Sequence, residues 1–487
     1  MINSEFFLLK NGQYIMSAYS SRRFEFIMGM HPELSSDYKW DEMSIAELFA
    51  DAYKDDTRYC KEHKTWYAYN GHIWEKDTGG LIVAERLKEF TRLLNIYCTE
   101  ISDEAIAKKY KTFIIKFTDR RARDRILKDA SSVYPIFAKQ FDQNPHLINC
   151  KNGTYDLKDF TFSNPSPEDF ITKSTSFKFT VRTDIKFDRW DEFITEITSG
   201  DVEKANFLQR ALGYSIFGIG KEECMFVAYG QTTRNGKGTL FNTIYSILGD
   251  YSKAPRVNMI CKGRFDNDIS KPNPALCVLQ GARFVTMSEP PENAMLDEET
   301  IKSFTGGDPV TTRQLYGESF TFIPQFKMWL SCNNLPIVND KSLFSSDRMK
   351  VIEFNRHFNE EDRDVNLKQK FLENDAIQYI FLWLVEGYKK YLKEGLEQPL
   401  ALKKALANYE RDNDKIGLFF EEMCEEDADA KTPAMGIYTS YKMWSKLNGY
   451  TFSGSIRFNR DFERFGKKIK PQGVTHFKGV KLKAVIR

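Results

Sequence analysis

Four short apolar segments in the middle of the chain have the length and composition of buried β-strands. They are CMFVAYG (residues 224–230), RFVTMSE (283–289), FKMWLSCNN (326–334) and MKVIEF (349–354). After the first segment, apolar residues recur at helical spacing from Leu240 to Leu248, and Gly249 closes the predicted helix. Strands that alternate with helices and loops indicate a three-layer α/β domain with a largely parallel sheet.

The segments on either side of this α/β domain have different patterns. Aromatic and polar residues alternate around Asn70-Gly71, which predicts a hairpin, and residues 80–140 have the pattern of charged helices. Residues 1–50 are weakly patterned and receive no assignment. Residues 421–430 (EEMCEEDADA) predict a solvated helix end or linker, and the tail beyond them is basic. We therefore expect a mixed α+β unit over 1–180, the α/β unit over 181–400, and a linker with a small domain over 401–487.

Composition narrows the class of protein only slightly. The 487 residues are 41% hydrophobic and 28% charged, as in ordinary globular proteins, and the net charge of +2 means that any nucleic-acid surface must be local. Eight cysteines without a C-x-x-C pair argue against a disulfide framework or a cysteine zinc site and fit a reducing cytoplasm. Since the chain has no signal pattern and no run of eighteen apolar residues, we expect no membrane partner.

The stretch YGQTTRNGKGTL (229–240) is similar to a phosphate-binding loop with altered spacing. The usual loop has glycine, four residues, glycine, lysine and then serine or threonine. Here the first glycine, Gly230, is one place early and the hydroxyl of Thr239 is one place late, which leaves open whether Gly230 or Gln231 makes the first turn. In a working loop, Lys237 would contact the β- and γ-phosphates and Thr239 would bind Mg²⁺. The alternative is a simple turn before a surface helix.

Polar residues at the ends of the other predicted strands favour the working loop. Glu289 ends the second strand and can orient an attacking water and support Mg²⁺, although Ser288 precedes it where many such ATPases carry aspartate. Asn333 follows the third strand and can position water, and Arg348 precedes the fourth and could reach a phosphate on an adjacent subunit. Each has an ordinary alternative, namely a helix cap, a turn and a surface salt bridge. All of these signals occurring in the required order are much rarer by chance than any one alone.

With these motifs the chain resembles the phage, plasmid and poxvirus primase-helicase family, whose motor is a superfamily 3 helicase of AAA+ type. The matching text lies between about Trp66 and Phe354 and includes NGTYDL, SPEDFITK, LGYSIFG, TTRNGKGT, RFVTMSEP, IKSFTGGDPVTTRQLYGESFTFIPQFKMWLSCNNLP and DRMKVIEF. The resemblance implies ATP and Mg²⁺ as cofactors and a working loop. The implied ATP-binding residues are Gly230, Arg234, Asn235, Gly236, Lys237, Gly238, Thr239 and Leu240. The implied catalytic residues are Glu289 as the Walker B glutamate, Asn333 as the sensor and Arg348 as a trans-acting arginine, with Thr239 and Glu289 holding the metal.

The resemblance also implies two DNA-binding surfaces. In this helicase class a hairpin between the Walker B and sensor strands lines the pore of a ring, and the matching segment is 305–323. The candidates there are Lys302 and Arg313 for phosphates and Tyr316 for stacking on bases, the alternative being a surface hairpin with core aromatics. The tail is similar to a winged-helix domain, in which one helix would enter origin duplex DNA. Its candidates, expected near one helix face, are Arg457, Arg460, Arg464 and Lys468.

Together these features predict an ATP-dependent DNA helicase and replication initiator of a phage or mobile element. Because Arg348 needs a neighbour's nucleotide, we expect a homo-oligomeric ring, with six as the expected subunit number, acting on single-stranded DNA in the bacterial cytoplasm. Residues 1–150 lack the paired carboxylates and histidine of a primase-polymerase, so a separate primase is an expected partner. Two alternatives stay open: a DNA-binding initiator whose ATP site only switches assembly, and a nucleotide kinase, although kinases carry this loop near the chain start.

Overall fold

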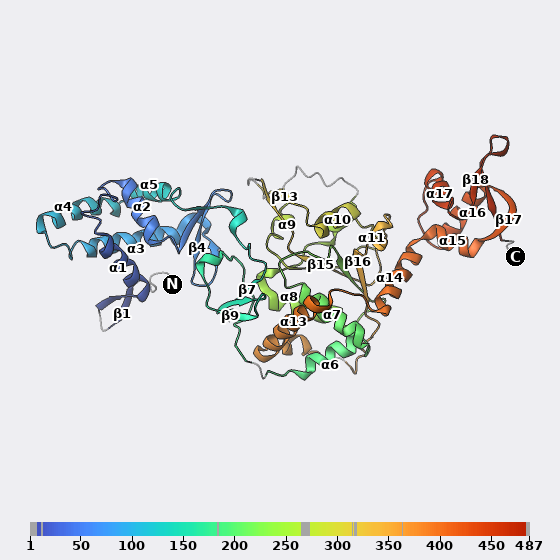
Figure 1. Cartoon of the computed structure of the whole chain (residues 1–487), viewed down its shortest axis with the longest axis horizontal. Helices are drawn as coiled ribbons and strands as arrows, with labels where there is room; N and C mark the ends of the chain where they lie inside the picture. Colours follow the sequence, from blue (N-terminus) through green and yellow to red (C-terminus); the bar gives the residue numbers. More distant parts are fainter. Residues whose placement is uncertain are drawn as a thin grey trace.

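The computed structural model describes residues 7–10, 13–182, 185–263, 273–313, 315, 319–362 and 364–483. The chain forms three bodies in sequence order along its longest axis, and each body has its own buried apolar core (Figure 1). Within the described residues, none of the helices combines the length and the apolar character that crossing a bilayer requires.

The first body combines helices with a small sheet. Its helices are α1 (Ala18–Met30), α2 (Glu42–Ala52), α3 (Leu81–Tyr97), α4 (Glu104–Ile114) and α5 (Arg120–Ala130). Its sheet has the order β5 (Trp74–Lys76), β4 (Thr65–Tyr69), β3 (Thr57–Cys60) and β6 (Pro135–Ile136), and β1 (Phe7–Lys10) pairs with β2 (Gln13–Met16). The antiparallel pairing of β4 with β5 confirms the hairpin predicted around Asn70-Gly71.

A three-stranded antiparallel sheet leads from the first body to the central one. It consists of β7 (Leu147–Cys150), β8 (Gly153–Asp156) and β9 (Thr161–Ser163). The central sheet then has five parallel strands in the order β11 (Ser252–Lys253), β12 (Phe284–Ser288), β15 (Lys327–Cys332), β10 (Met225–Tyr229) and β16 (Met349–Glu353). All four predicted strands are confirmed. The sheet is the centre of a mixed α/β fold, and the carboxyl ends of its strands lie along one edge. The edge strand β11 was not predicted, because two residues are too short to show a pattern.

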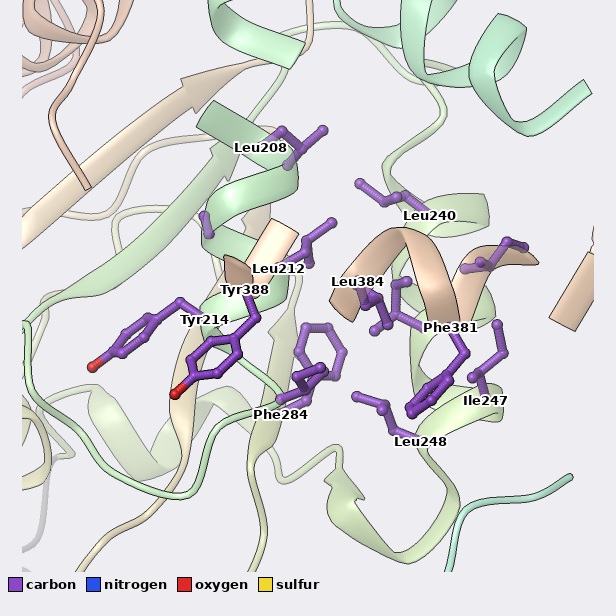
Figure 2. Close-up of a cluster of buried hydrophobic side chains, with 14 of the residues drawn as sticks. Leu208, Leu212, Tyr214, Leu240, Ile247, Leu248, Phe284, Phe381, Leu384 and Tyr388 are labelled. Carbon is purple, nitrogen blue, oxygen red and sulfur yellow. The ribbon is translucent and has the colours of Figure 1, made fainter. Parts of the chain in front are cut away.

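Helices cover both faces of the central sheet. One face carries α6 (Asp188–Ile197), α7 (Val202–Tyr214), α8 (Lys237–Leu248) and α13 (Asn374–Glu394). The other carries α9 (Pro274–Cys277), α10 (Glu298–Gly306), α11 (Ser342–Ser345) and α14 (Leu400–Asn413), while α12 (Leu367–Lys370) lies beside α8. Figure 2 shows leucines of α7, α8 and α13 gathered around Phe284 of β12. Because successive residues of a strand point to opposite faces, Phe226 and Val227 enter different cores, as three layers require.

The third body packs three helices on a small antiparallel sheet. The helices are α15 (Lys415–Met423), α16 (Ala434–Leu447) and α17 (Ser455–Phe462), and the strand order is β17 (Cys424–Pro433), β19 (His476–Leu482) and β18 (Lys467–Ile469). The predicted linker over 421–430 is therefore wrong beyond the end of α15, because most of it is strand β17. Its carboxylates face the basic strand β19, where Lys481 Nζ lies 3.2 Å from Glu425 and 3.0 Å from Asp427.

The basic helix of the tail is shorter than predicted. Phe458 and Phe462 are buried one helical turn apart, and the next aromatic ring, Phe465, stacks on Phe420 with 4.1 Å between centroids. A Cβ built at Gly466 would lie 2.8 Å from Val480 Cγ2, so the chain passes close to β19 and continues as strand β18. The helix thus ends at Phe462.

Candidate active site

The glycine-rich loop joins β10 to α8 at the carboxyl edge of the central sheet. The Gly230 amide donates to the Cys332 carbonyl at 3.2 Å, which fixes the start of the loop against β15. A Cβ at Gly230 would lie 2.8 Å from the Phe354 backbone carbonyl oxygen, so a larger residue does not fit. This close approach favours Gly230 over Gln231 as the glycine position that begins the loop.

The second glycine sets the beginning of α8. Gly236 has φ 84°, which favours glycine, and a Cβ there would lie 2.3 Å from Ile197 Cγ2. The helix starts at the next residue, Lys237, and no side chain caps its first turn. The uncapped amides of a helix N-terminus attract anions, so this geometry is compatible with a bound phosphate.

Lys237 lies under the loop with its ammonium directed at neutral acceptors. The side chain is buried, and its Nζ lies 3.3 Å from the Gly230 carbonyl oxygen and 3.0 Å from Asn333 Oδ1. Burial lowers the pKa of Lys237, and the nearby Glu289 charge opposes that shift. The described residues provide no salt bridge to this ammonium, which leaves its charge available to an anionic ligand.

Asn333 connects Lys237 to Glu289. Asn333 follows β15, and its Nδ2 lies 3.4 and 3.5 Å from the two carboxylate oxygens of Glu289, which follows β12. The Glu289 backbone is held by a hydrogen bond to the Ser331 carbonyl at 3.0 Å, and its carboxylate is exposed. Because β10, β15 and β12 are neighbours in the sheet, three of the predicted site residues meet at one edge.

The segment after β16 braces the outside of the loop. The Phe358 amide donates to the Arg234 carbonyl at 2.8 Å, and His357 Nδ1 lies 2.8 Å from the Thr233 carbonyl oxygen. The Arg234 guanidinium is half exposed and lies 3.8 Å from Glu360. Sequence reasoning missed His357 and Phe358, since the only available signal was a polar stretch after the fourth strand.

The remaining predicted loop residues have different roles. Asn235 is buried and donates to the Thr232 carbonyl at 2.6 Å, so it stabilises the loop conformation. Gly238 and Thr239 lie in the first turn of α8, the former exposed and the latter half-buried. The Leu240 side chain is fully buried in the core, and its backbone amide donates to the Gly236 carbonyl oxygen at 3.0 Å. Leu240 therefore supports the loop from below and offers no group to a phosphate.

A magnesium ion at this site would have few protein ligands. Within the described residues no group of three or more His, Cys, Asp and Glu side chains is gathered as a metal site. The Glu289 carboxylate and the Thr239 hydroxyl are oxygen donors of the kind Mg²⁺ prefers. Since Mg²⁺ commonly keeps waters and binds substrate phosphates with only one or two carboxylates, these residues fit a nucleotide-bound ion rather than a closed protein cage.

Arg348 lies at the opposite edge of the sheet from Lys237. It precedes β16, and five strand residues separate it from the carboxyl edge, which is about 16 Å at the usual rise. Its guanidinium donates to Thr305 Oγ1 at 2.8 Å and lies 2.7 Å from the Glu223 carboxylate. The arginine thus cannot reach the nucleotide loop of its own chain.

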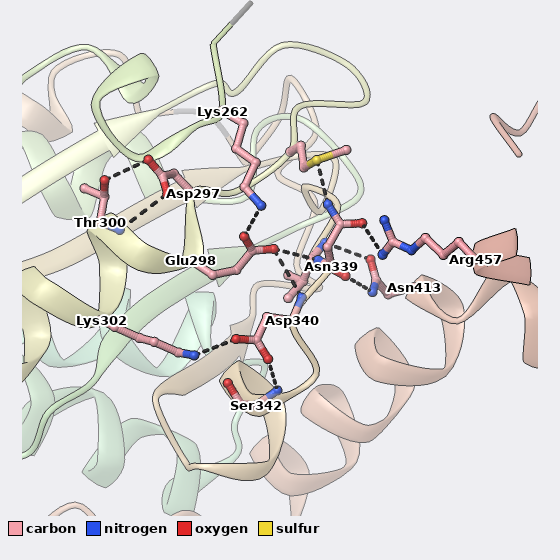
Figure 3. Close-up of polar contacts among 12 residues, drawn as sticks. Lys262, Asp297, Glu298, Thr300, Lys302, Asn339, Asp340, Ser342, Asn413 and Arg457 are labelled. Carbon is pink, nitrogen blue, oxygen red and sulfur yellow. Dashed lines mark hydrogen bonds and ion pairs between the residues drawn. The ribbon is translucent and has the colours of Figure 1, made fainter. Parts of the chain in front are cut away.

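The hairpin predicted within 305–323 is present, with β13 (Val310–Arg313) antiparallel to β14 (Ser319–Phe322). Arg313 is exposed at the end of β13, and Tyr316 lies outside the described residues. Lys302 lies on α10, before the hairpin, and its Nζ is 2.5 Å from Asp340 (Figure 3). This ion pair lowers the pKa of Asp340 to about 2. Lys302 therefore forms a salt bridge within the central body, and the sequence pattern did not indicate this pairing.

The four basic residues predicted on one face of the tail helix are separated in the structure. Arg457 and Arg460 lie on α17, where Arg457 donates to Asn339 of the central body at 3.2 Å (Figure 3). Arg464 follows the helix and contacts Asp414 at 2.5 and 2.6 Å, and Lys468 lies in β18, 3.0 Å from Glu463. The single basic face is wrong because the helix ends at Phe462. Arg457 and Arg460, with residues 454–456, line an open hollow of about 630 Å³.

Protein-family models match both flanks and the centre of the chain. The model described as D5 N terminal like covers residues 46–199, and the model described as Poxvirus D5 protein-like covers residues 411–483. Between them, a family of unknown function, DUF5906, matches residues 228–348, which include the glycine-rich loop, Glu289 and Asn333. The two D5 matches lie outside the loop and sensor motifs and so are independent of them.

Curated relatives include proteins of large DNA viruses. "Putative helicase L207/L206" of Acanthamoeba polyphaga mimivirus is 26% identical over 83% of this chain and 46% of its own length. "Putative helicase 121R" of Invertebrate iridescent virus 3 is 24% identical over 85% of this chain and 50% of its own length. The chain thus spans about half the length of these relatives. Among solved structures, the apo NrS-1 C terminal region has a TM-score of 0.48 at 12% identity, covering 91% of this chain and 100% of that chain.

Proposed function

We propose that this chain is an ATP-dependent DNA helicase and replication initiator, because its flanks match the models described as D5 N terminal like and Poxvirus D5 protein-like and its curated relatives are putative helicases. The observation that supports ATP hydrolysis most directly is the series of contacts from Lys237 through Asn333 to Glu289 at the carboxyl edge of a parallel sheet. These contacts place a cation, an amide and a carboxylate beside a glycine loop and a helix N-terminus. That combination serves phosphoryl transfer, which depends on positioning and electrostatic stabilisation.

In the proposed reaction the protein positions the reacting groups, and a Mg²⁺ ion held by Thr239 and Glu289 would supply positive charge to the phosphates. Lys237 exchanges its contact with Asn333 for the β- and γ-phosphates, while the loop and the α8 amides surround them. Glu289 orients the attacking water and accepts a proton from it, and Asn333 holds the Glu289 carboxylate in place. Thr239 is the proposed hydroxyl ligand of the metal.

We propose a homo-oligomeric ring, with six as the expected number of subunits. The length of β16, about 16 Å, separates Arg348 from the carboxyl edge that carries its own loop, so a catalytic role requires the nucleotide of a neighbouring subunit. An arginine supplied by a neighbour stabilises transition-state charge without occupying the site between reactions. To act in this way Arg348, whose side chain is 19% exposed, has to leave both Thr305 and Glu223.

The proposed DNA contacts lie on two bodies. The hairpin of β13 and β14 would meet single-stranded DNA through Arg313 and Tyr316, and the third body would bind origin duplex DNA as a winged helix. In that body, Arg460 of α17 is the most exposed of the predicted DNA-binding side chains, with a side chain 73% exposed. A separate primase remains a proposed partner. The relatives come from viruses named for an amoeba and an invertebrate, so we propose a viral element, and a bacterial host has no support from them.

The decisive experiment measures ATPase activity with and without single-stranded DNA. A motor hydrolyses ATP faster when DNA is present, whereas an initiator whose nucleotide only switches assembly hydrolyses slowly and does not respond. The second candidate is favoured by Ser288, which stands where an additional carboxylate would strengthen the metal site. Rapid DNA-stimulated turnover would exclude the switch, and the absence of stimulation by any single strand would exclude the motor.

A further inference from the structure

A cavity of about 270 Å³ lies where the first body meets the central one. Its lining includes Lys76 of β5, Lys253 of β11 and Phe320 of the hairpin strand β14. The Phe320 ring meets His63 of the first body edge-on, with 6.2 Å between centroids. We call this space the junction cavity, and one of its walls is the hairpin proposed to meet DNA.

The junction cavity is rich in positive charge. Lys76, Lys173 and Lys253 line it, and Asp142 is the one acid among the described residues of the lining. The Asp142 carboxylate is already engaged, because it accepts hydrogen bonds from the Thr172 amide at 2.8 Å and the Thr172 hydroxyl at 2.5 Å. It also lies 3.9 Å from Lys173 Nζ, so it is shared between two partners.

The ammonium groups of Lys76 and Lys253 have no hydrogen-bond or ion-pair partner among the residues that the structure describes. Lys253 is half-buried, and burial together with the charge of Lys173 lowers its pKa. Lys76 is exposed, so the desolvation cost falls on Lys253, and an anion beside that charge would lower the free energy of the folded protein. The arrangement therefore indicates a site for a negatively charged ligand.

Aromatic side chains beside the lysines indicate what kind of anion fits. Phe320 and His63 line the cavity and are half-buried, whereas Tyr67 and Phe141 line it but are buried against each other, with 4.5 Å between their ring centroids. Aromatic faces next to lysines are the usual combination for a base and its phosphate. The volume lies just below the usual range for small-molecule sites, so it suits a single nucleotide unit rather than a longer segment.

We propose that the junction cavity binds one phosphate group of a single-stranded nucleic acid, with Lys76 and Lys253 as its main cations. This inference rests on the proposed function, since the strand would come from the hairpin whose Phe320 forms part of the wall. A strand held there contacts the hairpin at Phe320, which pairs with Thr312 one residue pair from the end of the two strands. The first body then contributes directly to strand binding.

The test compares the double variant Lys76→Ala/Lys253→Ala with Lys108→Ala/Lys109→Ala, two exposed lysines of α4 that give the same change in net charge. The affinity for an oligo-dT strand is measured by fluorescence anisotropy, without nucleotide, across a series of salt concentrations. We expect the slope of log K against log salt to fall by about 0.7 in the cavity variant, which is one single-strand phosphate contact. The control should keep the wild-type slope.

A second measurement identifies the source of the phosphate. Thymidine monophosphate is titrated into wild type and the cavity variant, and binding is followed by ³¹P NMR. Equal salt slopes in the two double variants would overturn the proposal, and a cavity that binds only the free nucleotide would overturn the assignment to a strand. If wild type binds no single strand while it hydrolyses ATP, the DNA part of the proposed function fails, and the nucleotide titration alone decides whether the cavity is an anion site. The single variant Lys76→Ala, at an exposed position, replaces the double variant if the latter does not fold.

Discussion

Lys237 Nζ lies 3.0 Å from Asn333 Oδ1, and this contact links the nucleotide loop to the residue that directly follows β15. The lysine is held by a side-chain amide and a backbone carbonyl rather than by a carboxylate, so its positive charge is not neutralised. A phosphate that enters the loop can therefore gain the full attraction of the ammonium while breaking only neutral contacts. The same movement frees Asn333 Oδ1 and changes how the amide holds Glu289.

Replacing this cation should stop the reaction. Lys237→Ala removes the main charge on the β- and γ-phosphates and leaves the loop backbone in place, so we expect ATP turnover to fall to background. ATPase assays with and without DNA check this, and Lys368→Ala, an exposed lysine of α12, provides the matched loss of charge. Turnover near the wild-type rate in Lys237→Ala would mean that the loop is not the nucleotide site.

Glu289→Gln should separate nucleotide binding from hydrolysis. The amide keeps the size of the side chain and can still contact Asn333, but it cannot accept a proton from water. We expect ATP binding to persist, hydrolysis to be lost, and oligomers to accumulate with ATP, as measured by nucleotide binding and light scattering. Normal hydrolysis by Glu289→Gln would show that this carboxylate is not the base.

The sequence was sufficient to predict four of the five strands of the central sheet and the residues that follow them. Buried parallel strands are continuous apolar runs, so their ends are visible in the sequence, and β10, β12 and β15 are directly followed by Gly230, Glu289 and Asn333. Charge patterns were less informative, because they do not show which charges pair. Glu425 and Asp427 of β17 pair with Lys481 of the neighbouring strand β19. Lys302 pairs with Asp340, which lies 38 residues further along the chain.

The tail shows why a basic run is a weak predictor of a DNA-binding face. Helical periodicity was extended from Arg457 to Lys468, but buried aromatic residues and Gly466 end the helix after two turns. The junction cavity was equally hidden, since its lysines come from segments nearly 180 residues apart and lie together only after folding. Long-range pairing of this kind has no local signal in the sequence.

Arg348→Ala should leave ATP binding intact and reduce hydrolysis, because the side chain lies at the edge of the sheet away from its own loop. Arginine fingers contribute roughly 10³ to 10⁵ in rate where they have been measured in GTPases. Mixing inactive Arg348→Ala subunits with inactive Lys237→Ala subunits should restore part of the activity at interfaces that combine an intact loop with an intact arginine. Confirmed mixed oligomers that show no recovery at any ratio would contradict a role in trans.

Arg460→Ala and Arg464→Ala should behave differently, although sequence reasoning placed both in one DNA-binding face. Arg460 is mostly exposed, and its ion pair is with its sequence neighbour Asp461 at 3.0 Å, so we expect its loss to weaken duplex binding and to lower the salt slope by about 0.9, one duplex phosphate. Arg464 is paired with Asp414 at the start of α15, so its loss should reduce the stability of the third body. Duplex binding and thermal melting of both variants check this, and equal effects on DNA binding would restore the single basic face.

Lys327 provides a test of stability against pH. Its ammonium is buried beneath the sheet, lies 4.5 Å from the Tyr214 ring centre and 3.1 Å from the Gln325 carbonyl oxygen, and has no carboxylate partner among the described residues. Burial, together with the nearby charge of Arg283, holds the pKa of Lys327 well below its usual value. Between that lowered pKa and about 10.4, the ordinary lysine value, the unfolded chain binds a proton that the folded chain does not.

The free energy of unfolding should therefore rise with pH through this window, by at most about 1.4 kcal/mol per pH unit from this residue. Lys327→Met keeps the apolar stem and removes the titrating group, so the variant should lose that rise. It should be more stable than wild type at neutral pH, and the difference should shrink as the pH approaches 10. Urea unfolding of wild type and Lys327→Met from pH 7 to 10 measures the difference, with Lys108→Met as an exposed control that should not alter the pH dependence. Parallel curves for wild type and Lys327→Met would mean that the buried lysine stays protonated in the folded protein throughout, held by the carbonyl oxygens and aromatic rings around it.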